Sequence, residues 1–225
     1  MTGASPRGAW RGPLAGVAAV LLVTAVLGWA TQGFTVITTE DARRRAIRRT
    51  PVVVPTAPAR AADGRELDAL AEGAGVTPRA VPRTAIVAFF YARCPGVCGR
   101  LGESLQRVQQ LVRARGIADD VRVLSLSFDH AHDTPDALAR YARERNVDDA
   151  IWDVRVLVPG TARDALLESF SVVVIPDGAA GFQHNAALHV VTPDRRLIRI
   201  LDLDDAEGAV ATAMAIGGMS NVASR

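Results

Sequence analysis

The chain has 225 residues, of which 49% are hydrophobic, enough for one domain with a buried core plus extensions. Its 26 basic and 24 acidic residues give a formal net charge of +2 at pH 7, and aromatic residues make up 5% of the sequence. This near-balanced charge and the scarcity of aromatic residues argue against a nucleic-acid partner. The two cysteines are neighbours in the sequence, which indicates a functional site rather than a framework of disulfides.

The amino-terminal end has the pattern of a membrane anchor. An uncharged apolar run over residues 13–30 follows Arg7 and Arg11, and its length is close to the roughly 17–25 residues that cross a bilayer as a helix. The arginines before the run predict a cytoplasmic amino terminus. The alternative is a cleaved signal peptide, but the run is longer than a typical signal core, which favours a retained transmembrane helix. We therefore expect a single-pass protein of the cell inner membrane, with its soluble domain in the periplasm.

The sequence divides into three parts. Residues 1–31 are expected to form the cytoplasmic tip and the membrane anchor, residues 32–60 a juxtamembrane helix and linker, and residues 61–225 the soluble domain. Within the middle part, the charged residues 39–49 predict a short helix, and the three prolines that follow it predict an extended linker.

The soluble domain alternates predicted strands and helices. Continuous apolar runs indicate strands buried on both faces, and apolar residues at spacings of three and four indicate helices. Thr134 and Pro135 have the pattern of a helix start, with threonine as N-cap and proline in the first helical position. This alternation predicts an α/β fold of the thioredoxin type. The expected elements, in chain order, are a strand at 85–91, a helix ending near 116, a strand at 121–128, a helix at 135–145, a strand at 154–158, a helix at 161–170, a strand at 171–175, a loop at 176–183, a hairpin of 186–192 and 197–202 turned at Pro193-Asp194, and a helix at 205–216.

Cys94 and Cys98 lie in the short loop between the strand at 85–91 and the helix that follows it. Cys98 falls in or just before the first helical turn, where unpaired N–H groups and the helix dipole favour a thiolate. The carboxyl edge of the sheet is also where open α/β folds place their sites. Two acidified sulfurs at this spacing can bind a soft metal or exchange electrons as a dithiol/disulfide pair, and the cysteines alone do not choose between these.

His184 is the histidine that we expect to share the site, because it stands just before a strand and should point into the same edge crevice. Two thiolates and one imidazole suit copper, since sulfur holds Cu(I) and the harder nitrogen also allows Cu(II). His189 lies in mid-strand at an odd offset from His184, so it should face the other way; we interpret it as structural and as the second choice of ligand. His130 and His132 flank an acidic loop near the same edge and are expected to be solvated.

Three motifs occur in order along the chain: the stretch from Phe90 to Cys98, then Ser127-Phe128-Asp129 with Asp133-Thr134-Pro135, then His184-Asn185-Ala186-Ala187 followed by Pro193-Asp194. With these motifs, residues 81–202 resemble the Sco/SenC family of membrane-tethered copper proteins. The sequence departs from the family pattern at Gly99, where many members have proline, and at Asn185, which replaces a common serine. The segment between Phe170 and His184 is also short, which leaves the choice of partner open because surface loops carry recognition.

The resemblance implies a thioredoxin-like fold in which Cys94, Cys98 and His184 bind one copper, as Cu(I), Cu(II) or both. It also implies delivery of copper to the CuA site of cytochrome c oxidase subunit II or to another periplasmic copper protein. Asp129 matches an acidic family position near the site, so we assign it a role beside the ligands or in redox tuning, with loop capping as the alternative. We do not expect a turnover enzyme. The rival hypothesis is a thiol-disulfide oxidoreductase that needs Cys94 and Cys98 but not His184.

Overall fold

The computed structural model describes residues 11–30, 39–73, 82–94, 97–178 and 181–223. The chain divides into two compact units, Met1–Ala46 and Ile47–Arg225. The first unit contains helix α1 (Arg11–Ala30) and most of helix α2 (Thr39–Arg49).

Helix α2 confirms the short charged helix expected at residues 39–49. Its acidic residues Glu40 and Asp41 lie in the first turn and its last turn carries Arg48 and Arg49, an arrangement that complements the helix dipole. The predicted membrane anchor coincides with α1. In the described part of the chain, no helix combines the length and the apolar character needed to cross a membrane.

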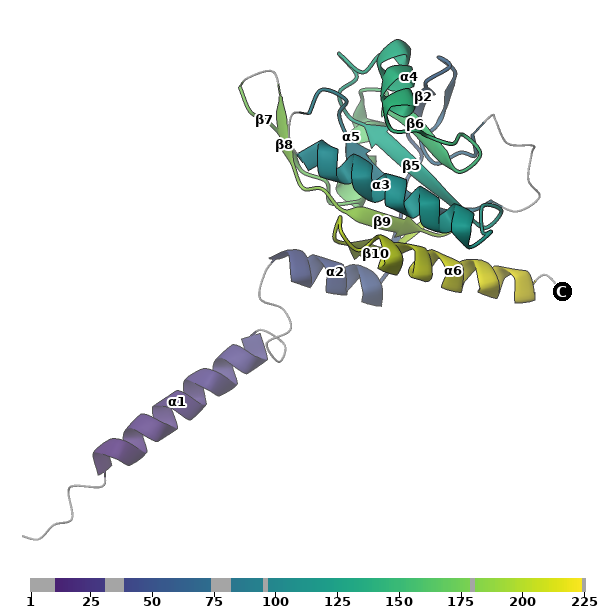
Figure 1. Ribbon diagram of the computed structural model, residues 1–225. Coiled ribbons are helices and arrows are strands. Elements are labelled where there is room, and N and C mark those ends of the chain that lie inside the picture. The colour runs from purple at the N-terminus through teal and green to yellow at the C-terminus, as the bar shows by residue number, and fades with distance from the viewer. Residues whose placement is uncertain (1–10, 31–38, 74–81, 95–96, 179–180, 224–225) are drawn as a thin grey trace, which may run out of the picture. The chain divides into compact units, whose positions relative to one another are not determined.

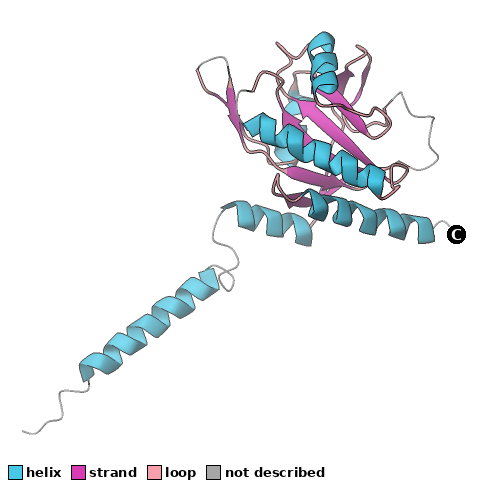
Figure 2. Cartoon of the chain, in the orientation of Figure 1, coloured by secondary structure: helices cyan, strands magenta, loops and turns pink. Residues whose placement is uncertain are grey.

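The second unit is built around an eight-stranded mixed sheet (Figures 1 and 2). Its three central strands, β4, β5 and β6, are parallel, and every residue of β4 and β5 is buried, as expected for strands covered on both faces. Strands β7 (Val174–Pro176) and β8 (Phe182–His184) form a separate antiparallel pair, the β7–β8 hairpin. The strands of the large sheet, in spatial order, are β1 (Val52–Val53), β10 (Arg196–Leu201), β9 (Leu188–Val191), β4 (Thr84–Phe90), β5 (Val121–Ser127), β6 (Trp152–Leu157), β2 (Pro58–Ala61) and β3 (Glu66–Asp68).

Helices cover both faces of this sheet. Helices α3 (Val97–Ala114) and α6 (Ala206–Ala223) lie side by side, with α3 against β5 and α6 against β4 and β9 (Figure 1). Helix α4 (Pro135–Glu144) packs on the same face, where the Tyr141 ring lies 4.5 Å from that of Phe90. Neighbouring strand residues point to opposite faces. Phe89 therefore points to the face opposite that of Phe90. There its ring centroid lies 4.9 Å from that of Phe170, the residue that follows α5 (Thr161–Ser169).

Part of the segment that we expected to be a linker belongs to the sheet. Strand β1 pairs with β10 and β2 pairs with β6, so residues 52–61 hold the first and the seventh positions in the strand order. In a flat sheet these positions would be about 29 Å apart, whereas the five residue steps from Val53 to Pro58 reach about 18 Å at most. The sheet must therefore curl so that its two edges approach each other. The sequence hid these strands because they have two and four residues, too few for a period, and because prolines lie before β1, between the two strands and at the first residue of β2.

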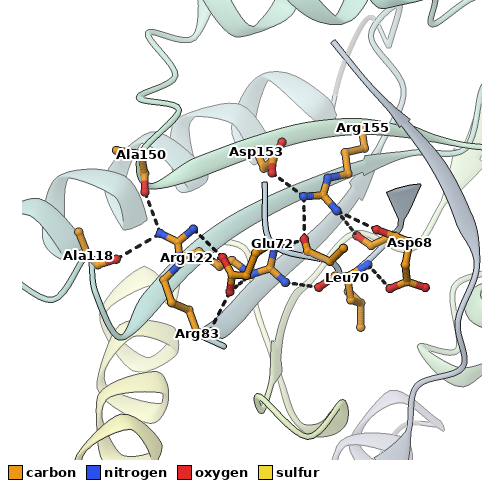
Figure 3. Close-up of polar contacts among 11 residues, drawn as sticks. Asp68, Leu70, Glu72, Arg83, Ala118, Arg122, Ala150, Asp153 and Arg155 are labelled. Atoms are coloured by element: carbon orange, nitrogen blue, oxygen red, sulfur yellow. Dashed lines mark hydrogen bonds and ion pairs between the residues drawn. The ribbon is translucent and has the colours of Figure 1, made fainter. Parts of the chain in front are cut away.

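A layer of buried arginines lines the concave face (Figure 3). Arg83, Arg122 and Arg155 are all at most 4% exposed, and they pair with the carboxylates of Glu72 and Asp153. Burial lowers the pKa of Arg122 to about 10, which still leaves it charged at neutral pH. The segment around residues 68–71 that closes this face is irregular, so its backbone carbonyls need donors from side chains. The accepting carbonyls are those of Asp68, Ala69, Leu70, Ala71, Ala118 and Ala150.

The other predicted elements of the second unit are confirmed to within a few residues. Thr134 is the N-cap of α4, with its side chain accepting from the N–H of Ala137 at 3.3 Å, and β9 and β10 form the hairpin turned at Pro193-Asp194. The structure differs at residues 176–183, which we expected to be a loop: β8 begins there, at Phe182.

Candidate functional site

The cysteines follow the end of β4, as predicted. Cys94 is half-buried, packs against the hydrophobic core and donates its backbone N–H to the carbonyl of Tyr91 at 3.3 Å. Cys98 is the second residue of α3, so the expected position in the first helical turn is confirmed. Pro95, Gly96 and the side chain of Cys98 lie outside the described part of the structure.

His184 is the last residue of β8, and its ring lies against the carboxyl ends of two central strands. The ring centroid is 5.1 Å from that of Phe128, just after β5, and 6.2 Å from that of Tyr91, just after β4. Burial lowers the pKa of His184, which favours the neutral imidazole, the form that binds metal ions. His184 thus lies at the same sheet edge as the Cys94 loop.

The β7–β8 hairpin that carries His184 is closed at its base by one side chain. The Asn185 amide oxygen accepts from the N–H of Val173 at 2.8 Å, and its amide nitrogen donates to the carbonyl of Ser171 at 2.9 Å. Asn185 therefore joins both ends of the hairpin.

Asp129 is almost fully buried beside the cysteine loop, with 2% of its side chain exposed. Its carboxylate accepts from the guanidinium of Arg93 at 3.1 Å and from Nδ1 of His132 at 2.8 Å. Arg93 directly precedes Cys94, so Asp129 reaches the cysteine loop through that arginine. His132, which we expected to be solvated, keeps 47% of its side chain exposed but is anchored to this carboxylate.

Asp133 is a second buried carboxylate to which sequence reasoning gave no role. One of its oxygens accepts from the Ser127 hydroxyl and from the N–H of Ala92 at 2.9 Å, while the other is buried without a partner among the described residues. Burial raises the pKa of Asp133. Asp133 therefore holds the backbone two residues before Cys94. Its spacing of four residues from Asp129 was the one sequence signal that could have identified it.

The remaining histidines do not join this cluster. His189 is 1% exposed, contacts the carbonyl of Val87 through Nδ1 at 3.2 Å and packs edge-on against Phe89 and Phe170. It is a core residue on the concave face, in agreement with the structural role that we expected. His130 is half-buried and lies on the wall of the neighbouring groove.

A groove of about 800 Å³ adjoins the site. It runs between α5, the end of β5 and the β7–β8 hairpin, and its lining is mostly apolar. Phe128 and Phe182 belong both to the groove wall and to the aromatic cluster around His184. The other lining residues include Asp129, His130, Arg163, Leu167, Glu168 and Val172.

Among the described side chains, no group of three or more His, Cys, Asp and Glu residues is placed so that it could hold a metal ion. The side chain of Cys98 is not among those described. The structure brings Cys94 and the first turn of α3 to the sheet edge that His184 and Asp129 also occupy. An imidazole and two thiolates are the kind of donors that copper prefers.

Comparison with known proteins finds relatives by sequence and by fold. A protein homologous to SCO1 from Bacillus subtilis is 25% identical over 116 residues, which cover 49% of this chain and 58% of that protein. The match therefore spans less than two thirds of that relative. Among solved structures, BsSco, a member of the Sco family of cytochrome c oxidase assembly proteins described for its disulfide switch, is 18% identical with a TM-score of 0.60 over 75% of this chain and 95% of that one. ScoI from Bradyrhizobium japonicum, solved with copper bound, is 20% identical with a TM-score of 0.55 over 73% of this chain and 99% of that one.

The fold and the motif define the class: a mixed α/β, thioredoxin-like domain with a Cys-x3-Cys motif at the carboxyl edge of its sheet. The SCO1/SenC family model matches residues 72–216, which is more than half of the chain. The chain belongs to the SCO1/SenC family.

Proposed function

We propose that this protein is a copper chaperone in which Cys94, Cys98 and His184 hold one copper ion. Three things support the proposal: membership of the SCO1/SenC family, the copper-bound structures of ScoI proteins, and the chemistry of the donors. The observation that carries it is the position of His184, whose ring lies against Tyr91 and Phe128 at the sheet edge where Cys94 also lies.

The proposed chemistry follows from the redox state of the two sulfurs. Reduced Cys94 and Cys98 supply soft donors for Cu(I), and the imidazole of His184 allows Cu(II) to be held as well. A disulfide outside the cytoplasm could accept the two electrons and two protons of the Cys94 and Cys98 thiols by thiol-disulfide exchange, which would form a Cys94–Cys98 disulfide and reduce the oxidant to two thiols. This step removes both sulfur ligands, so the redox potential outside the cytoplasm would control the release of copper. Asp129 is proposed to stabilise the loop through Arg93 rather than to bind the metal itself.

The experiment is a titration of the reduced full-length chain with Cu(I) and with Cu(II) under anaerobic conditions. We expect one copper per chain, with Cu(I) lost in Cys94→Ala and Cys98→Ala and Cu(II) strongly weakened in His184→Ala. His130→Ala is the matched control, because His130 lies on the wall of the groove and outside the donor set. Undiminished binding in a chain that lacks all three donors would refute the proposal.

The thiol-disulfide oxidoreductase remains the rival hypothesis, and metal-free protein distinguishes it. Such an enzyme would reduce a disulfide substrate such as insulin with both cysteines, and His184→Ala would leave its rate unchanged. A fast reaction of this kind, together with the absence of copper binding, would favour the rival.

The partner and the membrane anchor are further parts of the proposal. We propose cytochrome c oxidase subunit II, or another periplasmic copper protein, as the acceptor, since a structural relative is described as an assembly protein of that oxidase. Copper-loaded protein should then restore the absorption of the CuA site in the metal-free soluble domain of subunit II.

Anchoring to the cell inner membrane is supported by the uncharged sequence of residues 13–30, which follows Arg7 and Arg11. We expect the full-length chain to remain with membranes during alkaline carbonate extraction. A chain carrying Leu21→Asp and Leu22→Asp should be released. Release of the unchanged chain would contradict the anchor.

A further inference from the structure

The β7–β8 hairpin presents a structural question, because it carries His184 but is not part of the large sheet (Figure 1). The two strands pair with each other, with Val174 opposite His184, and they share no ladder with the eight-stranded sheet. The position of His184 relative to the cysteine loop is therefore set by side chains rather than by a continuous sheet.

Tyr91 makes the contact that joins the hairpin to the body of the domain. It follows the last residue of β4 and is 2% exposed. The N–H of Phe182 donates to the Tyr91 hydroxyl oxygen at 3.2 Å, and the hydroxyl donates to the carbonyl of Phe182 at 3.2 Å. One side chain thus satisfies both backbone groups of a strand residue, as a neighbouring strand would.

The same residue contacts two of the three candidate ligands, Cys94 and His184. The backbone carbonyl of Tyr91 accepts from the N–H of Cys94 at 3.3 Å, and its ring packs edge-on near His184. Phe182 is two residues before His184, so the two side chains lie on the same face of β8. That face packs against Phe128, at 5.5 Å from the Phe182 ring and 5.1 Å from the His184 ring.

We propose that the Tyr91 hydroxyl holds His184 at the distance from the cysteine loop that metal binding requires, which makes Tyr91 a positioning residue of the site. This inference rests on the proposed copper function. The aromatic contacts of the cluster are non-directional and tolerate sliding, whereas two hydrogen bonds to one residue fix both the height and the direction of the strand. Without the hydroxyl, the hairpin would keep its apolar contacts but sample other positions.

The test is the Tyr91→Phe variant of the full-length chain, which keeps the ring and removes both hydrogen bonds. We expect Cu(II) affinity to fall by about tenfold, the equivalent of one or two ordinary hydrogen bonds. Cu(I) affinity should change less, because the two sulfurs hold Cu(I). The thiolate-to-Cu(II) absorption and the nitrogen hyperfine pattern in electron paramagnetic resonance should shift toward those of His184→Ala.

The control and the double variant separate positioning from general stability. The chain has two tyrosines, and Tyr141 is also buried, on α4 against Phe90. Tyr141→Phe should leave the copper spectra unchanged. In a His184→Ala background, Tyr91→Phe should have no further effect on Cu(II) affinity. Wild-type spectra in Tyr91→Phe, or an equal loss of affinity with and without His184, would overturn the inference.

A metal-free measurement keeps the inference testable even if the copper proposal fails. Amide hydrogen exchange over residues 182–184 should accelerate at least about tenfold in Tyr91→Phe. In this variant the hairpin can open without breaking the two hydrogen bonds that join the Tyr91 hydroxyl to the backbone of Phe182. Tyr141→Phe should leave this exchange as it is in the unchanged chain. Equal exchange in Tyr91→Phe and in the unchanged chain would overturn the positioning role whether or not the protein binds copper.

Discussion

Replacement of Arg155 by methionine tests the polar layer that closes the concave face of the sheet (Figure 3). Arg155 is fully buried and donates to the carbonyls of Asp68 at 2.9 Å, Ala69 at 3.1 Å and Ala71 at 2.8 Å, and to the carboxylate of Asp153. Methionine retains most of the apolar stem, so the change removes mainly the charged donors.

The loss of stability in Arg155→Met depends on which of these backbone carbonyls keep a second hydrogen-bond donor. The carbonyl of Ala71 also accepts from Arg122 at 2.6 Å, and that of Asp68 also accepts from the N–H of Ala71 at 3.0 Å. Among the described donors, the carbonyl of Ala69 depends on Arg155 alone. One orphaned buried acceptor costs about 1–3 kcal/mol, and each further lost hydrogen bond costs about 1 kcal/mol. Asp153 is partly exposed and can be rehydrated, so we expect a total loss of roughly 3–5 kcal/mol in the free energy of unfolding.

Urea unfolding measures this loss through the fluorescence of Trp152, which is buried and donates to the Ser125 hydroxyl at 2.9 Å. Trp10 and Trp29 are replaced by phenylalanine in all samples to isolate that signal. With a slope of about 2 kcal/mol per molar urea, the midpoint should fall by about 1.5–2.5 M. Arg65→Met is the matched control, since the ion pair of Arg65 with Asp63 is exposed and should contribute less than about 1 kcal/mol.

An equal, small loss in Arg155→Met and Arg65→Met would refute this reasoning. It would mean that the desolvation of the buried guanidinium cancels the hydrogen bonds it donates, a result that is known for some buried ion pairs. A large loss with an unchanged slope would show that the arginine stabilises the folded state without altering the extent of unfolding.

Two further predictions concern the surroundings of the site. Burial raises the pKa of Asp133, so the folded state binds the proton of this carboxyl more tightly than the unfolded chain does. The protonated carboxyl therefore contributes to the free energy of unfolding below the unfolded pKa, and this contribution is lost as the pH rises through the folded pKa. Asp133→Asn should remove that dependence, and urea midpoints measured from pH 4 to pH 7 that run parallel for both chains would contradict this. Asn185→Ala should speed amide exchange over residues 174–184 while leaving the exchange of β4 and β5 unchanged, because it opens the base of the hairpin alone. Faster exchange in β4 would show instead that Asn185 supports the whole domain.

The sequence alone was sufficient for the features that depend on local patterns. The apolar runs of β4 and β5, the N-cap at Thr134 and the position of Cys98 in the first turn of α3 all follow from neighbours a few residues apart. His184 was selected because it precedes a predicted strand at the same sheet edge, and the structure places its ring there, against Phe128.

Tertiary structure decided the features whose partners are far apart in the chain. Tyr91 and Phe182 are 91 residues apart, and Arg155 bonds a segment more than 80 residues away, so no local period could predict either contact. Strands β1 and β2 were missed for the same reason, since short strands are stabilised by the curled sheet that receives them rather than by their own sequence. The pattern of residues thus determined the elements and the candidate ligands, and the long-range hydrogen bonds determined how those ligands are held.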